Sequence, residues 1–161
     1  MKLRPQRNPI PFTWYGTDHR LRSICETIEG LGERVLDHGL VMTPDMDFNE
    51  VIRLAGNIST AKAINIRLSE GTFTIKESIT IPYERVYISG VPGATVIERT
   101  TDDGTPMITL SGREVALRGI RFDDSAEDTA ACVKVTGSRC VVTGCVFDDC
   151  FRAIEVNGTS S

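Results

Sequence analysis

Residues 111–124 read Ser-Gly-Arg-Glu-Val-Ala-Leu-Arg-Gly-Ile-Arg-Phe-Asp-Asp, and 25 positions later residues 136–149 read Thr-Gly-Ser-Arg-Cys-Val-Val-Thr-Gly-Cys-Val-Phe-Asp-Asp. Two glycines, one phenylalanine and an Asp-Asp pair recur at the same offsets in both stretches. A fixed period of about 20 to 50 residues is typical of stacked supersecondary units, none of which can bury its apolar face alone. The repeat therefore predicts a solenoid.

Four short segments, each with a polar residue between two apolar ones, extend this repeat in both directions. They begin at Ile79, Ile108, Val133 and Ile154, at spacings of 29, 25 and 21 residues. A period of two indicates a strand with one buried face, and the β-branched side chains favour strand over helix. We expect all the flanking apolar side chains to point inward: Ile79, Ile81, Ile108, Leu110, Val133, Val135, Ile154 and Val156.

A second strand follows in three of these units, at 86–90, 115–119 and 140–144, and each segment ends in a glycine that suits a corner. No helical segment separates the strands, although parallel strands in an open α/β sheet would need helical crossovers. The pattern predicts an all-β, parallel β-helix with two or three strands in each coil and residues 64–156 in stacked strands.

Stacking places equivalent side chains about 4.8 Å apart in adjacent coils. We expect Phe122 to lie against Phe147, and Leu117 against Val142. Residues 47–56 are predicted to form a short capping helix at the N-terminal end. Asp47 can cap its start, its apolar face follows helical spacing, and Gly56-Asn57 can end it: the face comprises Phe48, Val51, Ile52 and Ala55.

The order of these segments resembles a known family. The chain is similar to the entry of a pectate-lyase-like right-handed parallel β-helix, as found in bacteriophage tailspikes and related virion appendages. The similar segments are, in order, Val-Leu-Asp-His-Gly at 35–39, the short helix, residues 64–75 and the coils that follow. The resemblance covers roughly residues 35–161. It implies a right-handed single-stranded β-helix, a virion protein assembled in the host cytoplasm, and a homotrimer.

Residues 1–17 are different in composition and are expected to form an extended docking arm. They contain three prolines and no apolar period. Residues 1–22 hold five basic residues and one acidic residue, a net charge of +4. Since the whole chain has a net charge of −4, the remaining residues carry −8. A pre-extended, basic and aromatic segment suits a groove on another virion protein, although a disordered tail is the alternative. The basic residues are too few and too scattered for a nucleic-acid stripe. The predicted contact residues are Arg4, Arg7, Phe12, Trp14 and Tyr15.

Residues 18–34 are expected to form a short helix. Four apolar residues follow spacings of 3, 4 and 3, as in a coiled-coil seam, and the mixture of Ile and Leu favours three strands. The alternative is one amphipathic helix packed on its own domain. The predicted trimer interface comprises Leu21, Ile24, Ile28 and Leu31.

Composition excludes several other classes. The chain is 40% hydrophobic and 25% charged, with no apolar run long enough for a membrane span and no secretory signal. Its five cysteines include no Cys-x-x-Cys pair, and the cluster of four at 132–150 lies far in sequence from both histidines, so we expect no metal, no cofactor and no disulfide. Cys140 and Cys145 align with Val115 and Ile120, which predicts small buried side chains in a reducing cytosol. The other cysteines and the two histidines, for which we expect neither a metal nor a disulfide, are Cys25, Cys132, Cys150, His19 and His38.

The repeated Asp-Asp pairs are the weak catalytic candidates: Asp123, Asp124, Asp148 and Asp149. Equivalent carboxylates in adjacent coils would lie about 5 Å apart, which is close to the separation in a retaining glycosidase. Asp-Asp after a strand is also ordinary turn chemistry, and no nearby Arg or His completes a lyase set. We expect all four to be solvent-facing turn residues without a catalytic role.

The last segment, 153–156, begins another coil, and no cap is recognisable after it, so we expect further coils or another subunit at this end. Three functions stay open: a structural tail appendage that docks by its arm and presents a β-helix for host attachment, a polysaccharide depolymerase that uses the stacked aspartates, and a non-viral carbohydrate-binding β-helix module. The host, its receptor and any surface polysaccharide are not encoded in recognisable motifs.

Overall fold

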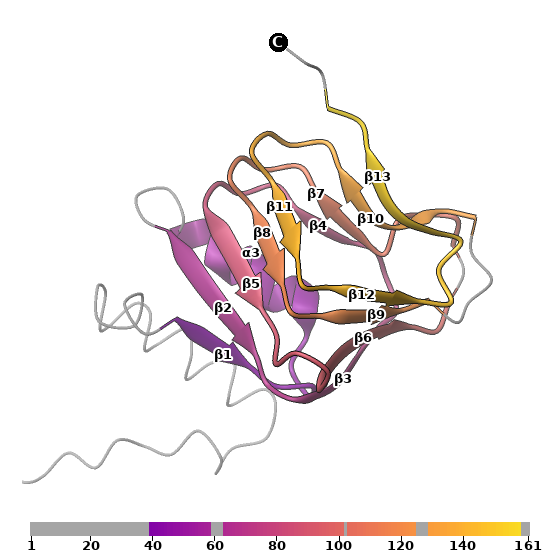
Figure 1. The fold of residues 1–161 in the computed structure, drawn as a ribbon. Coiled ribbons are helices and arrows are strands. Elements are labelled where there is room, and N and C mark those ends of the chain that lie inside the picture. Colours follow the sequence, from indigo (N-terminus) through magenta and orange to yellow (C-terminus); the bar gives the residue numbers. More distant parts are fainter. Residues whose placement is uncertain (1–38, 59–62, 102, 125–128, 159–161) are drawn as a thin grey trace, which may run out of the picture.

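The computed structural model describes residues 39–58, 63–101, 103–124 and 129–158 of the 161-residue chain. Within these residues the chain forms thirteen strands and one helix, and every strand pair is parallel. Figure 1 shows the strands winding into a solenoid of about four coils. The predicted parallel β-solenoid is therefore confirmed, whereas its handedness stays a prediction.

Three sheets make the three faces of the solenoid. Sheet 1 has the order β1-β2-β5-β8-β11, with the strands Leu40–Met42, Ile64–Leu68, Val86–Ser89, Ala116–Arg118 and Val141–Thr143. Sheet 2 has the order β3-β6-β9-β12, with the strands Gly71–Ile75, Thr95–Arg99, Arg121–Asp123 and Val146–Asp148. Sheet 3 has the order β4-β7-β10-β13, with the strands Ile79–Ile81, Ile108–Leu110, Ala131–Val135 and Arg152–Val156.

Each coil contributes one strand to each sheet in turn, so that the first coil is β2-β3-β4 and the fourth is β11-β12-β13. The 25-residue repeat of the sequence is the offset between the third and fourth coils. Phe122 is in register with Phe147, and their rings stack with centroids 5.2 Å apart and planes 15° apart. Leu117 is in register with Val142. Both predicted contacts are confirmed.

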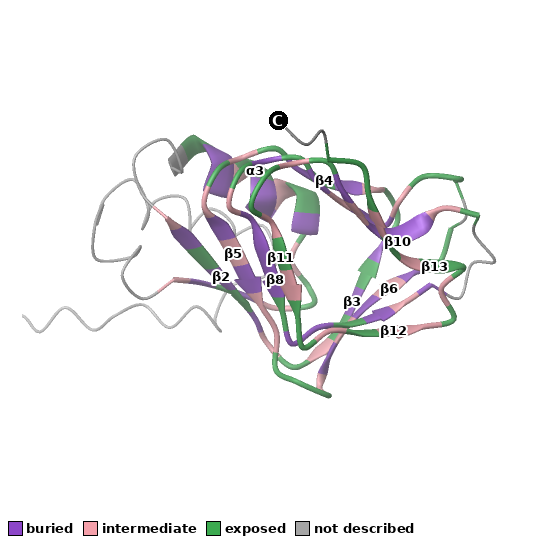
Figure 2. Ribbon diagram, turned by 45° about the horizontal axis from the view of Figure 1, so that its top comes forward, coloured by how far each residue is buried: buried purple, intermediate pink, exposed green. Residues whose placement is uncertain are grey.

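The core consists of ladders of like side chains that run along the solenoid. In sheet 3 one ladder joins Ile79, Ile108, Val133 and Ile154. The first three are fully buried. Ile108 and Val133 lie between two coils, and Ile79 in β4 lies between β7 and helix α3, whereas Ile154 in the fourth coil is 38% exposed. Figure 2 shows the same trend in the other sheets, where the strands of the fourth coil are mostly exposed or intermediate.

Two of the eight side chains expected to be buried are therefore exposed. Ile154 and Val156 pair in register with Val133 and Val135, as predicted, but Val156 is 69% exposed. The register is correct, and the expectation of burial is wrong for these two residues. The reason is that no strand of the described residues pairs with the outer side of β13.

The repeated glycines serve two different purposes. Gly119 and Gly144 have φ values of 62° and 60°, so they turn the corner between sheets 1 and 2 in the left-handed region. At Gly137, by contrast, an added Cβ would lie 1.9 Å from the carbonyl oxygen of Gly112, and a Cβ at Gly112 would lie 2.0 Å from that of Tyr83. This second column of glycines permits successive coils to approach closely.

Helix α3 (Phe48–Ile58) packs its apolar face against the solenoid, with Phe48 edge-on to Phe73 at 6.3 Å between ring centroids. Asp47 caps it as predicted, because its carboxylate accepts a hydrogen bond from the Glu50 backbone N–H at 3.1 Å. The predicted stop at Gly56-Asn57 is wrong. Gly56 lies inside the helix and against the Tyr83 ring, where a Cβ would be 2.1 Å from Cζ, so this glycine provides close packing.

Candidate functional site

The outer face of sheet 2 carries a ladder of three carboxylates. Glu98, Asp123 and Asp148 occupy equivalent positions on β6, β9 and β12, in register from coil to coil. The expected juxtaposition of Asp123 with Asp148 is therefore confirmed at the level of the backbone. Such a row of like charges is unfavourable unless cations or hydrogen bonds balance it.

An ion pair balances part of this ladder. Arg121 of β9 donates from Nε to the Asp148 carboxylate across one coil, and both side chains are partly exposed. Asp123 differs from Asp148 in that its Oδ1 atom is buried and has no hydrogen-bond partner in the structure. The two carboxylates that could form a hydrolytic pair thus have different environments, one neutralised by a guanidinium and one partly unsatisfied.

Asp124, the second residue of the same motif, is a structural residue in the interior. It is 1% exposed, and its carboxylate accepts two hydrogen bonds from Arg99, with Nε to Oδ1 at 3.1 Å and Nη2 to Oδ2 at 2.9 Å. The expectation that all four aspartates face solvent is therefore wrong for Asp124. Its burial is possible because a fully buried guanidinium stands in the preceding coil.

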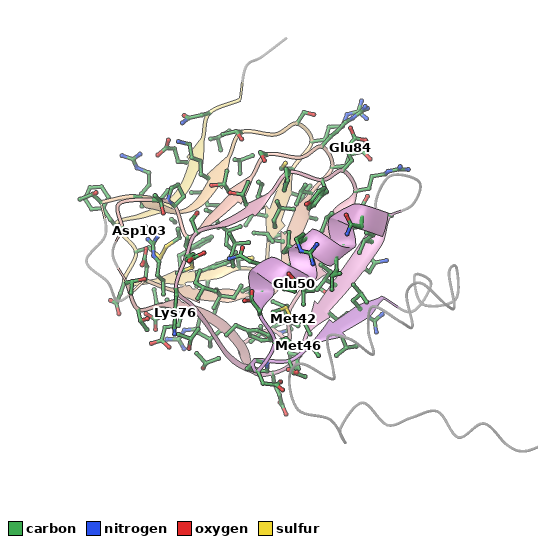
Figure 3. The ribbon with its side chains drawn as sticks, turned by 180° about the vertical axis from the view of Figure 1, so that it is seen from behind. Met42, Met46, Glu50, Lys76, Glu84 and Asp103 are labelled. Atoms are coloured by element: carbon green, nitrogen blue, oxygen red, sulfur yellow. A yellow bond between two sulfur atoms is a disulfide. The ribbon has the colours of Figure 1, made fainter. Side chains whose placement is uncertain are left out.

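The segment that follows β6 also contacts the buried Arg99 side chain. Arg99 also donates from Nη1 to the carbonyl oxygen of Thr105, and the same Nη1 lies 3.5 Å from Asp103 Oδ1. Asp103 in turn accepts hydrogen bonds from the side chain and backbone of Thr105, which hold the pKa of Asp103 below its ordinary value of 3.8. Asp103 lies at the edge of the molecule in Figure 3. Arg99 thus fixes the corner that joins sheet 2 to sheet 3.

A disulfide lies beside this ion pair at the same corner. Cys132 in β10 is bonded to Cys150, between β12 and β13, with the Cα atoms 6.2 Å apart. The Cys132 sulfur is 3.9 Å from Asp124 Oδ2. The expectation that the cysteines form no disulfide is wrong, because the register of Ala131 with Arg152 brings the two cysteines to one corner although they are not equivalent in the repeat.

The two other cysteines of the fourth coil are free thiols, and both are partly buried. Burial raises the pKa of the Cys140 and Cys145 thiols above the ordinary value of 9.0, so both are protonated at neutral pH. Cys140 and Cys145 are partly buried because they take the positions that Val115 and Ile120 occupy in the buried third coil. Cys140 and Cys145 pack against the core as expected, but they are only partly buried, so the prediction of buried side chains is correct in part.

The fourth coil also carries most of the large exposed apolar side chains in the described part of the molecule. They are Val141, Val146, Phe151, Ile154 and Val156, between 38% and 69% exposed. The outer edges of β11, β12 and β13 pair with no other described strand. Unpaired strand edges beside apolar side chains favour association with further β-structure.

The predicted contact residues Arg4, Arg7, Phe12, Trp14 and Tyr15, and the predicted trimer seam Leu21, Ile24, Ile28 and Leu31, lie outside the described residues. The proposed boundaries at 17, 34 and 35 do so as well.

In the part of the chain that the structure describes, no three His, Cys, Asp or Glu side chains gather as a metal site would require. A membrane-crossing helix is likewise not found there, since α3 has eleven residues.

Sequence reasoning missed Arg99 and the pairing of Cys132 with Cys150. A signal for Arg99 existed, because this arginine takes the inward-facing fifth position of β6, one period of 25 residues before Asp124, and a buried arginine requires an anionic partner. The cysteine pair offered no such signal, since its separation of 18 residues matches no repeat spacing.

Strand order, register and ladders together define a parallel β-solenoid protein. No protein-family model and no curated protein matches the chain. Among solved structures it is similar to ORF18 of Geobacillus virus E2, with a TM-score of 0.50 and 16% identity over 78% of this chain. The chain spans 27% of the length of that phage protein. At this identity the likeness shows a shared fold.

Proposed function

We propose that this chain is a structural protein of a bacteriophage particle, namely a tailspike-like or tail-fibre-like appendage or the part that anchors one. The observation that carries the proposal is the parallel β-solenoid itself, together with its likeness to a phage protein. The resemblance of residues 35–161 to pectate-lyase-like tailspikes supports the same class. The protein would be assembled in the host cytoplasm and reside in the virion.

The packing of the solenoid suits a mechanical role. Every described coil is tied to the next by three parallel strand pairs and by the stacked side chains of the core. At the corner between sheets 2 and 3, the Arg99–Asp124 pair and the disulfide add links between the second and third coils and between the third and fourth. Such a column transmits force along its axis because each coil is supported by its neighbours.

Attachment is assigned to the N-terminal region. In this proposal Arg4, Arg7, Phe12, Trp14 and Tyr15 contact another tail or portal-proximal protein, and the seam of Leu21, Ile24, Ile28 and Leu31 forms a trimer. The support comes from the sequence, in which prolines lower the entropy cost of ordering and the aromatic residues stand apart from the repeat.

The test compares particles purified by density gradient from hosts that produce the full chain, a chain lacking residues 1–17, or the Trp14→Ala variant. We expect the full chain to copurify with particles, the deletion to stay in the particle-free fraction, and Trp14→Ala to weaken attachment by about 2 kcal/mol or more. Equal incorporation of all three would refute the arm. A full chain absent from particles would refute the virion assignment and favour a non-viral carbohydrate-binding module.

A second candidate function is polysaccharide cleavage, favoured by one observation. Asp123 stands in register with Asp148 on an outer face, and its Oδ1 lacks a hydrogen-bond partner. The pairing of Asp148 with Arg121 argues against it, since it neutralises one of the two carboxylates. Turnover of host capsule or lipopolysaccharide that is lost in Asp123→Asn and in Asp148→Asn would establish this alternative.

A further inference from the structure

The disulfide connects the outermost described coil to the coil beneath it. Cys150 lies in the corner between β12 and β13 of the fourth coil, and Cys132 is in β10 of the third. Cys132 is fully buried, whereas Cys150 is partly exposed. The bond therefore ties a superficial segment to the core.

The fourth coil is the least buried of the described coils. Within the described residues its strands pair on one side only, and they are exposed or intermediate, in contrast to the buried ladders of the third coil. Segments with few buried apolar contacts and one-sided pairing open at low free-energy cost. Closing the 18-residue separation between the two cysteines removes conformational freedom from the opened state and so opposes this opening.

We propose that Cys132 and Cys150 form a redox-controlled latch on the fourth coil. In oxidising surroundings the bond holds the corner between β12 and β13 against β10. In a reducing cytosol the two thiols are free, and the fourth coil detaches locally while the inner coils stay folded. The latch goes beyond the proposed structural role and does not depend on it.

Formation of the bond follows ordinary thiol–disulfide exchange with a small-molecule disulfide such as oxidised glutathione. The Cys150 thiolate, which is the more accessible of the two, attacks one sulfur of the small disulfide and releases one thiolate. The Cys132 thiolate then attacks the Cys150 sulfur of the mixed disulfide and releases the second. Two protein thiols and one small disulfide thus become one protein disulfide and two small thiols.

After reduction, the Cys132 thiol has a hydrogen-bond acceptor nearby. The Cys132 sulfur lies 3.9 Å from Asp124 Oδ2, so the freed thiol can donate its S–H to the carboxylate that Arg99 holds in place. Reduction thereby leaves the buried Cys132 thiol with a hydrogen-bond acceptor. The consequence of reduction is confined to the fourth coil.

The test is hydrogen exchange read by peptide mass spectrometry on the purified full chain, after oxidised glutathione or after a thiol reductant. Peptide mapping first establishes which cysteines are bonded. We expect the oxidised protein to contain the Cys132–Cys150 bond, and amides of residues 146–156 to exchange about a hundredfold faster after reduction. Amides of residues 64–99 should not change.

Two variants make the result specific. Cys150→Ser, at a partly exposed position, should show the fast exchange of residues 146–156 in both redox states. Cys145→Ser removes a free thiol of the same coil and should behave as the unsubstituted protein does. The latch is overturned if mapping finds Cys132 and Cys150 unbonded after oxidation, if exchange in the fourth coil ignores reduction, or if reduction accelerates exchange equally in residues 64–99.

Discussion

Arg99 and Asp124 stand one sequence period apart and meet in the interior, where the guanidinium donates to both carboxylate oxygens at 3.1 and 2.9 Å. The arginine side chain is 0% exposed and the aspartate 1%. Because both charges are removed from water, the loss of Arg99 leaves Asp124 buried without a counter-ion, and the loss of Asp124 leaves Arg99 with only the more exposed Asp103 carboxylate. The pair links the second coil to the third.

The first prediction follows from this dependence. Asp124→Asn should lower the free energy of unfolding by about 3 kcal/mol or more, because the buried Arg99 charge loses its buried carboxylate and keeps only that of Asp103, which is 41% exposed and 3.5 Å from Nη1. Urea unfolding followed by circular dichroism measures the loss. The matched control is Asp149→Asn, which changes the equivalent exposed residue of the next coil and should alter stability by about 0.5 kcal/mol or less.

A double variant tests the interpretation of that loss. Arg99→Met combined with Asp124→Leu replaces both charges by apolar side chains and should recover most of the stability that Asp124→Asn loses. If the double variant is less stable than Asp124→Asn alone, the cost arises from packing and the charge argument is incorrect.

The second prediction concerns the close contact between coils at Gly137. Gly137→Ala would place a methyl group 1.9 Å from the backbone oxygen of Gly112, and since backbone cannot rotate away, the third and fourth coils must separate locally. We expect a loss of about 2 kcal/mol or more in unfolding free energy. Gly158→Ala, where no atom lies within 4 Å, should be nearly neutral. Similar effects of the two substitutions would contradict the proposed contact.

The third prediction tests the ladder in sheet 1. Leu117→Asp places a carboxylate with no partner between Ile88 and Val142 and should prevent folding, because an unpaired charge in an apolar interior cannot be satisfied. Far-ultraviolet circular dichroism and proteolysis detect the loss. Asn65→Asp, at an outward-facing position of β2, should fold normally. A fully structured Leu117→Asp protein would disprove the assignment of the core.

The fourth prediction is a pH dependence at Asp103. Hydrogen bonds from Thr105 hold its pKa below 3.8 in the folded protein, so the ionised form stabilises the fold. This contribution is complete above about pH 5 and is lost as the pH falls through the lowered pKa. Asp103→Asn should therefore be less stable than the unsubstituted protein at pH 7, and the difference should close below pH 3.8. A difference that is constant from pH 7 to pH 3 would exclude the carboxylate charge as its cause.

Much of the fold follows from local pattern and spacing. The alternation in segments such as 108–110 and 133–135 fixes which side chains face inward, and a constant period makes equivalent residues coincide when the coils stack. This explains why the pairs Phe122–Phe147 and Leu117–Val142 could be predicted. The equal spacing of equivalent residues can be read from a single sequence, so the pairs that it produces can be predicted without a structure.

The candidate functional residues were less predictable, because neighbouring coils give identical motifs different surroundings. The Asp-Asp motif occurs twice, yet Asp124 is buried and Asp149 is exposed. One period before Asp124 stands Arg99, a buried cation, whereas one period before Asp149 stands Asp124 itself. The motif alone does not show this difference.

By itself, the sequence determined the solenoid, its register and its inward-facing ladders, since these depend on periodicity along one chain. Only the tertiary structure decided that Arg99 neutralises Asp124, that Cys132 bonds to Cys150, and that Ile154 and Val156 are exposed in the outermost described coil. Those outcomes depend on which side chains occupy the adjacent coil at each corner. Winding creates that proximity. The sequence contained a spacing signal only for Arg99, which stands one period before Asp124, and none for the cysteine pair.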